Sequence, residues 1–470
     1  MKPNDTFANK IKGSNEEFIK SDLVPFLRVP SDTLNKKGIL QTKDFLVSYI
    51  SEFCVGIKEF SGEINPIIIA KVEGNSRKSL LIYMMYDTQP ISKENQWISD
   101  PFMAEVHNLS PPLDMLGECI IARGAYNSKT PLICFLNVVK ELKKEGELPI
   151  SLILVFDGEE ELGSPSLLEI LENNQEIFKD CIDAYYPSTK QNLAAKLVLK
   201  LGYKGILLLT IKISTNNKEP HSAFSGMIPN PALDLISLLS NIYANNKFLI
   251  TSLGKPYTLS KDEQLVFDEL IKNVDIERIK KKVGILQTQE ADQRISFKNY
   301  LFNPTFNIST LKSGFMKEGT KNYVPNEAIC KVDIRFANEI SEDVIFNEIK
   351  EKVELFSQSS NSKIELIKNM GYNSSRVPKD SIIVRSLIKV AKKLGFETEL
   401  WPISAAAAPL TIIQNILGLK YITGGLGIGG GAHSVNEFIQ YDSIINTRLS
   451  NYYFLKYYAQ MIQKEMGNII

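Results

Sequence analysis

The chain has 470 residues, 44% of them hydrophobic, which is enough for two domains that each have an apolar core. Lys and Arg together number 54, and so do Asp and Glu, so the charge balance gives no reason to expect nucleic acid or an acidic membrane as a partner. The sequence has no membrane-length apolar run, no signal-peptide core and no metal-type cysteine spacing, so we expect a cytoplasmic protein with reduced thiols.

From Asp22 onward the first part of the chain alternates between helical and strand patterns. The patterns predict helices at 41–53 and 129–144, and strands at 66–72, 80–85, 151–156 and 183–186. Such alternation implies a mainly parallel sheet covered by helices, because parallel strands need crossover connections. The expected fold class is therefore α/β.

The pattern changes after residue 202. A smaller α+β unit is predicted there, with strands at 206–213 and 328–336, helices at 231–243 and 342–356, and a Lys-rich helical stretch at 260–282. The alternation then returns with a helix at 380–394, followed by one long amphipathic helix at 441–465. We therefore expect one domain that is split into residues 1–202 and 371–470 by an inserted domain at 203–370.

One predicted strand runs directly into a cluster of acidic residues. The segment Leu152-Ile-Leu-Val-Phe-Asp-Gly-Glu-Glu-Glu-Leu-Gly-Ser-Pro165 is apolar for five residues and then carries four carboxylates within five positions. A fold tolerates such charge beside a buried strand only where cations or substrate chemistry compensate it, which indicates a functional site. The alternative is that the acids favour the dipole of a helix that starts near Ser164.

Four further motifs accompany the acidic cluster. They are Trp97-Ile-Ser-Asp-Pro-Phe102, Ala122-Arg-Gly-Ala-Tyr-Asn-Ser-Lys129, His221-Ser222 ahead of Pro229-Asn-Pro231, and Ala432-His-Ser-Val-Asn-Glu437. In order and spacing, the five motifs resemble the zinc aminoacylase and carboxypeptidase family, which includes carnosinase-like dipeptidases and acetylornithine deacetylase. The resemblance extends from about Asp22 to the C-terminus.

The resemblance implies a two-zinc site built from two histidines and three carboxylates, but several of those positions differ here. Met85 stands where the family has a histidine, Asn127 where it has the bridging aspartate, and Ser188 or Thr189 where it has a further aspartate. A thioether is a poor zinc ligand, and a neutral amide cannot bridge two zinc ions as a carboxylate does. A two-zinc centre is therefore not expected.

The ligands that remain under this resemblance are Glu161 and His433, with Asp87 as a third. Three ligands and a water can form an open metal site. The sequence thus predicts at most one zinc or other divalent ion, weakly bound.

The resemblance also assigns roles in catalysis and substrate binding. Glu160 is the general base that activates the attacking water, and His221 stabilises the oxyanion from a neighbouring subunit. Asn322 stands in the loop that offers a second polar group, and Arg335 holds the substrate carboxylate, a task suited to its forked guanidinium. In the family, the inserted domain is a lid that forms homodimers.

Two functions remain open at this point. The first is an amidohydrolase that cleaves dipeptides or N-acyl amino acids through Glu160. The second is a catalytically inactive member, a pseudoenzyme that binds such ligands or serves as the partner subunit of an active paralogue, which the changes at Met85, Asn127 and Ser188 favour. A third possibility, metal-free chemistry with Glu160 near Lys129 and Arg123, has no specific support in the sequence.

Overall fold

The computed structural model describes residues 5–91 and 96–467 of the chain. The expectation about the start of the chain falls partly on residues 1–4, which lie outside the described residues. The chain forms two compact units. Unit 1 comprises Met1–Leu201, Val377–Trp401 and Ile412–Ile470, and unit 2 comprises Gly202–Arg376 and Pro402–Thr411. The predicted boundaries of the inserted domain, 203 and 370, stay a prediction. The compact unit 2 of the structure additionally contains residues 202, 371–376 and 402–411.

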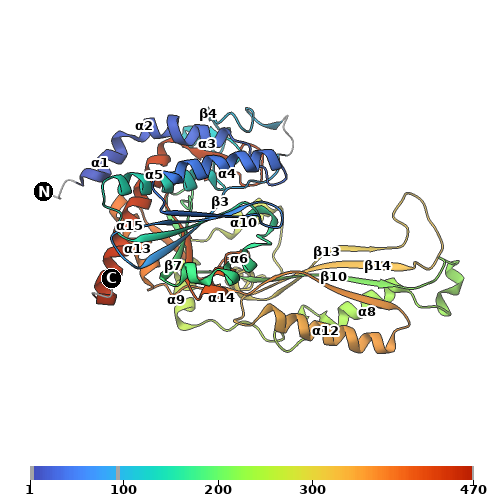
Figure 1. Cartoon of the computed structure of the whole chain (residues 1–470). Coiled ribbons are helices and arrows are strands. Elements are labelled where there is room, and N and C mark those ends of the chain that lie inside the picture. The colour runs from blue at the N-terminus through green and yellow to red at the C-terminus, as the bar shows by residue number, and fades with distance from the viewer. Residues whose placement is uncertain (1–4, 92–95, 468–470) are drawn as a thin grey trace. The chain divides into compact units, whose positions relative to one another are not determined.

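Unit 1 is built around a six-stranded sheet (Figure 1). Its strands, in order across the sheet, are β1 (Gly56–Phe60), β2 (Ile67–Val72), β6 (Ser151–Asp157), β3 (Ser79–Met85), β7 (Cys181–Pro187) and β18 (Lys420–Gly424). The last four strands are parallel to one another, whereas β1 and β2 pair antiparallel at one edge. Every residue of β3 and β6 is buried, as in strands covered by helices on both faces. The predicted α/β class with a mainly parallel sheet is confirmed.

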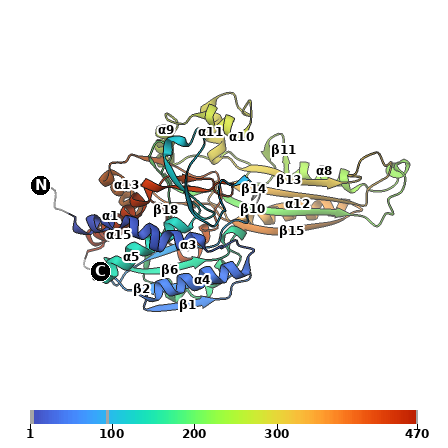
Figure 2. The same cartoon turned by 90° about the horizontal axis from the view of Figure 1, so that it is seen from above.

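The α-helices of unit 1 are α1 (Thr6–Gly13), α2 (Asn15–Phe18), α3 (Val24–Arg28), α4 (Lys36–Ser51), α5 (Lys129–Lys144), α6 (Leu167–Asn173), α7 (Gln175–Phe178), α13 (Ile382–Leu394) and α15 (Ile444–Met466). Helix α14 (Thr411–Leu417) begins at the last residue of unit 2 and continues in unit 1. Helices α3, α4 and α5 lie together over one face of the sheet (Figures 1 and 2). Helix α5 has the predicted bounds, because its apolar residues recur at helical spacing and are buried.

Two small sheets in unit 1 were not predicted. One consists of β19 (Gly429–Gly430), β20 (Phe438–Gln440), β5 (Glu118–Ile121) and β4 (Glu105–Asn108), in that order. The other pairs β8 (Leu197–Lys200) with β17 (Thr398–Trp401) in parallel. Their strands are short, and the pairings of β5 with β20 and of β8 with β17 join segments far apart in the chain, so local patterns give little sign of them. The first sheet brings the segments around 122 and 437 together.

Unit 2 contains a four-stranded antiparallel sheet with the order β13 (Thr305–Ser313), β14 (Glu327–Phe336), β10 (Gly205–Ser214) and β15 (Lys363–Tyr372). Helices α8 (Pro231–Ile242) and α12 (Glu342–Ser359) lie on one face of this sheet (Figure 1). Alternate strand residues and the apolar sides of both helices form one core, which includes Leu207, Ile211, Leu235 and Ile345. The short strands are β9 (Gly202–Tyr203), β11 (Tyr243–Ala244), β12 (Lys247–Phe248) and β16 (Ser375–Arg376).

Several predicted elements differ in detail. The helical stretch expected at 260–282 is broken into α9 (Lys261–Leu270) and α10 (Ile276–Val283), because Asp275 accepts a hydrogen bond from the Arg278 amide and starts a new helix; α11 (Gln293–Phe302) follows. The helix expected near Ser164 begins at Leu167 instead, since Ser164 adopts φ 54°. The long final helix is preceded by a 3-10 turn at Tyr441–Ser443.

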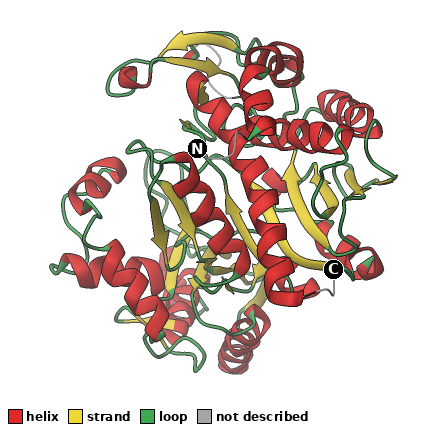
Figure 3. Ribbon diagram, turned by 90° about the vertical axis from the view of Figure 1, so that its left-hand side faces the viewer, coloured by secondary structure: helices red, strands yellow, loops and turns green. Residues whose placement is uncertain are grey.

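Helices and strands are both present throughout the described chain (Figure 3). All five cysteines are free thiols. Among the described residues, no helix combines the length and apolar character needed to cross a membrane.

Candidate functional site

The candidate site lies at the carboxyl ends of the parallel strands of unit 1. Met85, the last residue of β3, is in register with Asp157, the last residue of β6. The loops after β3, β6, β7 and β18 therefore leave the sheet at the same edge, which is where open α/β sheets bind ligands. Glu160 and Glu161 follow β6 in a short 3-10 helix, Glu160–Leu162.

Glu161 and His433 contact each other. Glu161 Oε2 lies 3.2 Å from His433 Nε2, and the Glu161 side chain is 3% exposed. The same carboxylate accepts hydrogen bonds from two side-chain amides, Asn127 Nδ2 at 3.0 Å and Gln89 Nε2 at 2.6 Å. The hydrogen bond with Glu161 raises the pKa of His433. Two side-chain amides thus donate to the carboxylate that the sequence resemblance predicts as a metal ligand.

Asp87 holds the backbone of this turn. Its two carboxylate oxygens accept hydrogen bonds from the backbone N–H groups of Glu160 and Glu161, at 3.2 and 3.1 Å. Asp87 is fully buried, and burial, with the carboxylates around it, raises its pKa well above the usual value. Its position fixes the acidic turn beneath Glu160.

Glu160 lies beside other negatively charged carboxylates. Burial, followed by the charges of Glu161 and Asp157, raises the pKa of Glu160 to about 8. His433 and Lys190 act in the opposite direction. Lys190 follows β7, and its ammonium lies 5.9 Å from the centre of the Tyr126 ring.

The other two acids of the cluster are structural. Asp157 accepts hydrogen bonds from the Tyr83 and Ser164 hydroxyls at 2.7 and 2.6 Å. Glu159 accepts backbone N–H groups of Ile64, at 2.6 Å, and of Asn65, at 2.8 Å. These carboxylates are therefore compensated by fixed donors within the fold.

The positions that differ from the family pattern are also placed by the structure. Met85 is buried in β3 and belongs to the core. The Asn127 amide donates to Glu161 and lies 3.4 Å from His433 Nε2. Ser188 and Thr189 are buried directly after β7, and the Ser188 amide donates to the Gly424 carbonyl at 2.8 Å.

A buried ion pair anchors the loop that carries Asn127. Glu437 Oε2 accepts a hydrogen bond from Arg123 Nη1 at 2.7 Å, and both side chains are almost completely buried. Glu437 Oε1 accepts the backbone N–H groups of Tyr126 and Asn127 at 3.0 and 2.7 Å. One carboxylate therefore connects the segment that follows His433 with the loop that carries Asn127. Lys129 donates instead to the Val29 carbonyl at 2.6 Å.

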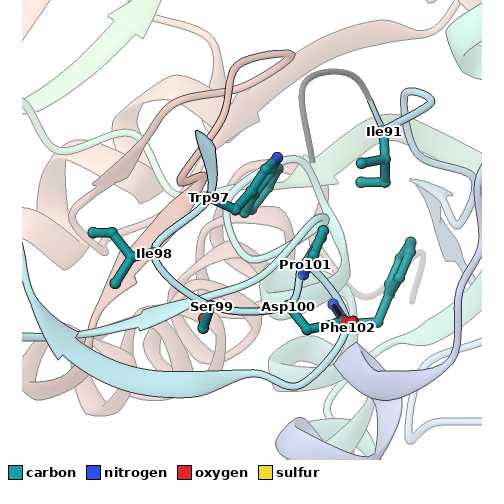
Figure 4. Close-up of a pocket in the computed structure, with 7 residues that line it drawn as sticks. All are labelled: Ile91, Trp97, Ile98, Ser99, Asp100, Pro101 and Phe102. Carbon is teal, nitrogen blue, oxygen red and sulfur yellow. Dashed lines mark hydrogen bonds between the residues drawn. The ribbon is translucent and has the colours of Figure 1, made fainter. Parts of the chain in front are cut away.

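A pocket of about 450 Å³ lies beside the segment that carries the first motif (Figure 4). It is lined by Ile91 and by the six residues from Trp97 to Phe102. The Arg123 guanidinium stacks over the Trp97 ring at 5.3 Å. None of the predicted site residues lines this pocket.

In unit 2, His221 and Asn322 lie in two loops that come together, whereas Arg335 lies on strand β14. His221 forms a β-bridge with Tyr323, and the Asn322 carbonyl accepts from the Ser222 amide at 3.2 Å. Arg335 pairs with Ile206 on β10, and its Nε lies 3.3 Å from Asp333 Oδ1. Half-exposed Arg335 thus pairs with the start of β10, whereas exposed His221 lies in the loop that follows the other end of β10.

Comparison with known proteins decides the family. The sequence profile of peptidase family M20/M25/M40 matches residues 81–454. The chain belongs to this family. It is 26% identical over 394 residues to the Cys-Gly metallodipeptidase dug1 of Schizosaccharomyces pombe, covering 79% of this chain and 80% of that protein. It is 22% identical over 464 residues to the human Beta-Ala-His dipeptidase, covering 93% and 85%.

Solved structures agree with the M20 assignment. A metallo-carboxypeptidase of the M20 family from Sulfolobus solfataricus superposes with a TM-score of 0.82 and 26% identity, covering 93% of this chain and 98% of that chain. The dipeptidase Dug1p of Saccharomyces cerevisiae superposes with a TM-score of 0.75 and 21% identity, covering 97% and 98%. The predicted family resemblance is confirmed.

The donor set of this M20 member does not fit the two-metal centre that the family implies. Among the residues described, no group of three or more His, Cys, Asp or Glu side chains is arranged to hold a metal ion. Glu161 and His433 lie together, but the oxygens of Asp87 are used by backbone N–H groups. Asn127 and Gln89 point amide donors, which repel cations, at Glu161.

We therefore predict that the purified protein holds at most one divalent ion per chain and loses it on dialysis against a chelator. Two neutral or weak ligands and one carboxylate cannot balance the charge of two zinc ions. Inductively coupled plasma mass spectrometry of protein purified without chelator measures the stoichiometry. Two tightly retained zinc ions per chain would contradict the prediction.

Sequence reasoning missed three residues in this region, namely Gln89, Lys190 and Glu437. Gln89 and Lys190 lie outside the motifs, and their proximity to the acidic turn depends on how strands β3, β7 and β18 lie in the sheet. Glu437 was part of a quoted motif, and an acid beside a histidine in a Gly-rich loop was a signal that could have been followed.

Proposed function

We propose that the protein hydrolyses the amide bond of dipeptides or N-acyl amino acids that carry a free carboxylate. Glu160 accepts a proton from the attacking water, and Arg335 binds the carboxylate. The observation that carries this proposal is the acidic turn itself, because Glu160 lies beside Glu161 and His433 at the ligand-binding edge of an M20 fold. The names of the relatives, a Cys-Gly and a Beta-Ala-His dipeptidase, support dipeptides as substrates.

A direct assay tests this proposal. The protein is incubated with Cys-Gly and with β-alanyl-histidine, with and without added zinc or manganese, and release of the free amino acids is followed by chromatography. Hydrolysis of either dipeptide supports the proposal. Absence of hydrolysis across all conditions counts against it.

A second function is favoured by particular residues. Met85, Asn127 and Ser188 replace family ligands, and a carboxyl group with a pKa of about 8 is mostly protonated at neutral pH and then accepts no proton. The alternative is therefore a protein that binds these ligands without cleaving them, or that acts as the partner subunit of an active paralogue. Ligand binding without hydrolysis in the same assay would select this function.

Arg335→Ala should weaken binding of a dipeptide by roughly 1.5 to 3 kcal/mol, the range for hydrogen bonds to a charged group. Calorimetric titration with β-alanyl-histidine measures the change. Lys331→Ala is the matched control, because Lys331 is an exposed cation on the same strand, four residues away. Equal losses in both variants would show that Arg335 has no specific role.

We also propose a homodimer formed through the inserted unit. The strand ends that place Arg335 and His221 are separated by roughly 26 Å, because β10 spans eight residue steps of about 3.3 Å from Ile206 to Ser214. A dipeptide is too short to reach both in one subunit. If both residues serve one ligand, the second must come from another subunit.

The dimer gives a simple expected result. Light scattering at micromolar concentration should yield about twice the mass of the 52.9 kDa chain. A monomer at that concentration would remove His221 and Asn322 from the proposed site. If the mass is that of a dimer, substituting the exposed residues of β13, an edge strand of the unit 2 sheet, tests whether this edge forms the interface.

A further inference from the structure

A chain of hydrogen bonds ends at the carboxylate of Glu161. It begins at Tyr186 in β7, whose hydroxyl donates to Ser128 Oγ at 2.8 Å. The Ser128 hydroxyl donates to Asn127 Oδ1 at 3.2 Å, and Asn127 Nδ2 donates to Glu161 Oε1 at 3.0 Å. The chain therefore joins β7, the residues directly before α5 and the turn after β6. Neither Tyr186 nor Ser128 has a role in the proposed function.

The order of donors along this chain fixes which way the Asn127 amide points. A hydroxyl carries one hydrogen, so Ser128, which accepts from Tyr186, has its own hydrogen left for Asn127 Oδ1. At the other end, a carboxylate only accepts hydrogen bonds, so Glu161 must meet the nitrogen of the amide and not its oxygen. Ser128 is 2% exposed, so water has little access to this link. Both ends select the same orientation of the amide.

A second amide and an imidazole complete the surroundings of Glu161. Gln89 Nε2 donates to Glu161 Oε2 at 2.6 Å, and His433 Nε2 lies 3.2 Å from the same oxygen. Both oxygens of this nearly buried carboxylate therefore already have partners. A buried carboxylate needs either fixed donors or a cation. Fixed donors meet that need here, at the residue that the sequence resemblance predicts as a metal ligand.

A divalent ion bound at Glu161 would have to break this chain. Zinc binds lone pairs of oxygen and nitrogen, so it would displace the N–H groups that face Glu161, and Asn127 would have to turn its oxygen toward the ion. That rotation presents the amide nitrogen to Ser128 and leaves the Ser128 hydrogen without its acceptor. A buried donor that loses its acceptor costs free energy, so the chain opposes metal binding.

We propose that Tyr186 and Ser128 are positioning residues, and that the Asn127 amide which they orient holds Glu161 in place of a divalent ion. The acidic turn of unit 1 is thereby assembled without metal, and zinc must compete with the amide. Gln89 contributes a second amide to the same carboxylate. This inference is independent of the proposed function, because it concerns the stability and the zinc affinity of the site and not hydrolysis.

Restoring a carboxylate tests the replacement of metal. Asn127→Asp brings a second negative charge to the side chain whose Nδ2 now lies 3.0 Å from Glu161 Oε1. Without metal, this variant should melt several degrees below the wild-type chain, because two carboxylates so close repel each other. Added zinc should raise its melting temperature by mass action, whereas zinc or a chelator should change that of the wild-type chain little. Asn127→Ala is the control for the lost hydrogen bond, because it adds no charge and should gain no response to zinc.

The positioning role is tested by removing single hydroxyls. Ser128→Ala should tighten zinc binding by at least about threefold, because the hydrogen bond that orients Asn127 no longer opposes its rotation. Tyr186→Phe should act in the same direction. Tyr83→Phe is the matched control, because its ring packs against Tyr186 with centroids 5.4 Å apart, whereas its hydroxyl donates to Asp157. This control should lower the melting temperature and leave the zinc affinity at the wild-type value. Competition with a chromophoric chelator measures the affinities.

Three outcomes would each overturn the inference. The first is a wild-type chain that zinc stabilises as much as it stabilises Asn127→Asp. The second is an Asn127→Asp variant that, without metal, is as stable as the wild-type chain. The third is an unchanged zinc affinity in both Ser128→Ala and Tyr186→Phe. If Asn127→Asp folds only when zinc is present, the inference is supported; if it folds in neither condition, the two hydroxyl variants decide.

Discussion

Replacing Glu160 by Gln should reduce the rate of dipeptide hydrolysis by at least ~10²-fold, the usual scale for removing a general base. The amide has nearly the same shape as the carboxylate but cannot accept a proton from water. The loss should appear mainly in kcat, because Arg335, the proposed partner of the substrate carboxylate, is unchanged and substrate binding should persist. Initial rates with Cys-Gly or β-alanyl-histidine measure the effect.

The neighbouring acids provide controls for Glu160→Gln. Glu169→Gln, an exposed position on α6, should have no effect on the rate. Glu159→Gln is a different case, because Glu159 accepts backbone hydrogen bonds from Ile64 and Asn65, so it should lower stability as well as activity. Turnover that survives Glu160→Gln would reject Glu160 as the base and would mean that another group activates the attacking water.

The large elements of the fold were predictable from local patterns, and the small ones were not. Helix α5 is long and strongly periodic, and strands β3 and β6 are largely apolar, so their positions follow from the sequence. Strands β19 and β20 contain two and three residues and pair with each other, and β20 also pairs with β5, about 300 residues earlier in the chain. Neither their length nor their composition distinguishes them from loops.

The residues of the candidate site were also predictable only in part. Glu160, Glu161 and His433 belong to motifs, and the structure brings the last two to 3.2 Å. Lys190 belongs to no motif, and its relation to Glu160 arises because β7 and β6 both flank β3 in the sheet. Which acids are compensated by fixed donors, as Asp157 is by Tyr83 and Ser164, also depends on contacts that the sequence does not display.

The buried pair of Arg123 and Glu437 should be the most sensitive point of unit 1. Glu437→Ala leaves the Arg123 guanidinium buried without a counter-charge, and it also removes the acceptor of the Tyr126 and Asn127 amides. Breaking a buried pair on one side costs about 3 to 5 kcal/mol, because the remaining charge is uncompensated. Urea denaturation of the whole chain should therefore show a markedly lower midpoint.

Fluorescence makes this measurement specific to one unit, because both tryptophans of the chain, Trp97 and Trp401, lie in unit 1. Trp97 additionally lies under the Arg123 guanidinium, so its emission reports on the pair itself. Glu437→Gln should cost less than Glu437→Ala, since the amide oxygen still accepts the two backbone N–H groups. A midpoint unchanged in Glu437→Ala would contradict the anchoring role.

A double-mutant cycle decides whether charge or packing carries the effect. Arg123→Met/Glu437→Gln removes both charges and keeps an acceptor for the loop, so it should recover much of the stability lost in Glu437→Gln alone, because no uncompensated ion remains. If the stability loss comes from the ion pair, the coupling energy between the two positions is large. If the two changes simply add, Glu437 acts only through the Tyr126 and Asn127 amides, and the loop that carries Asn127 should then be the first part of unit 1 to gain hydrogen exchange.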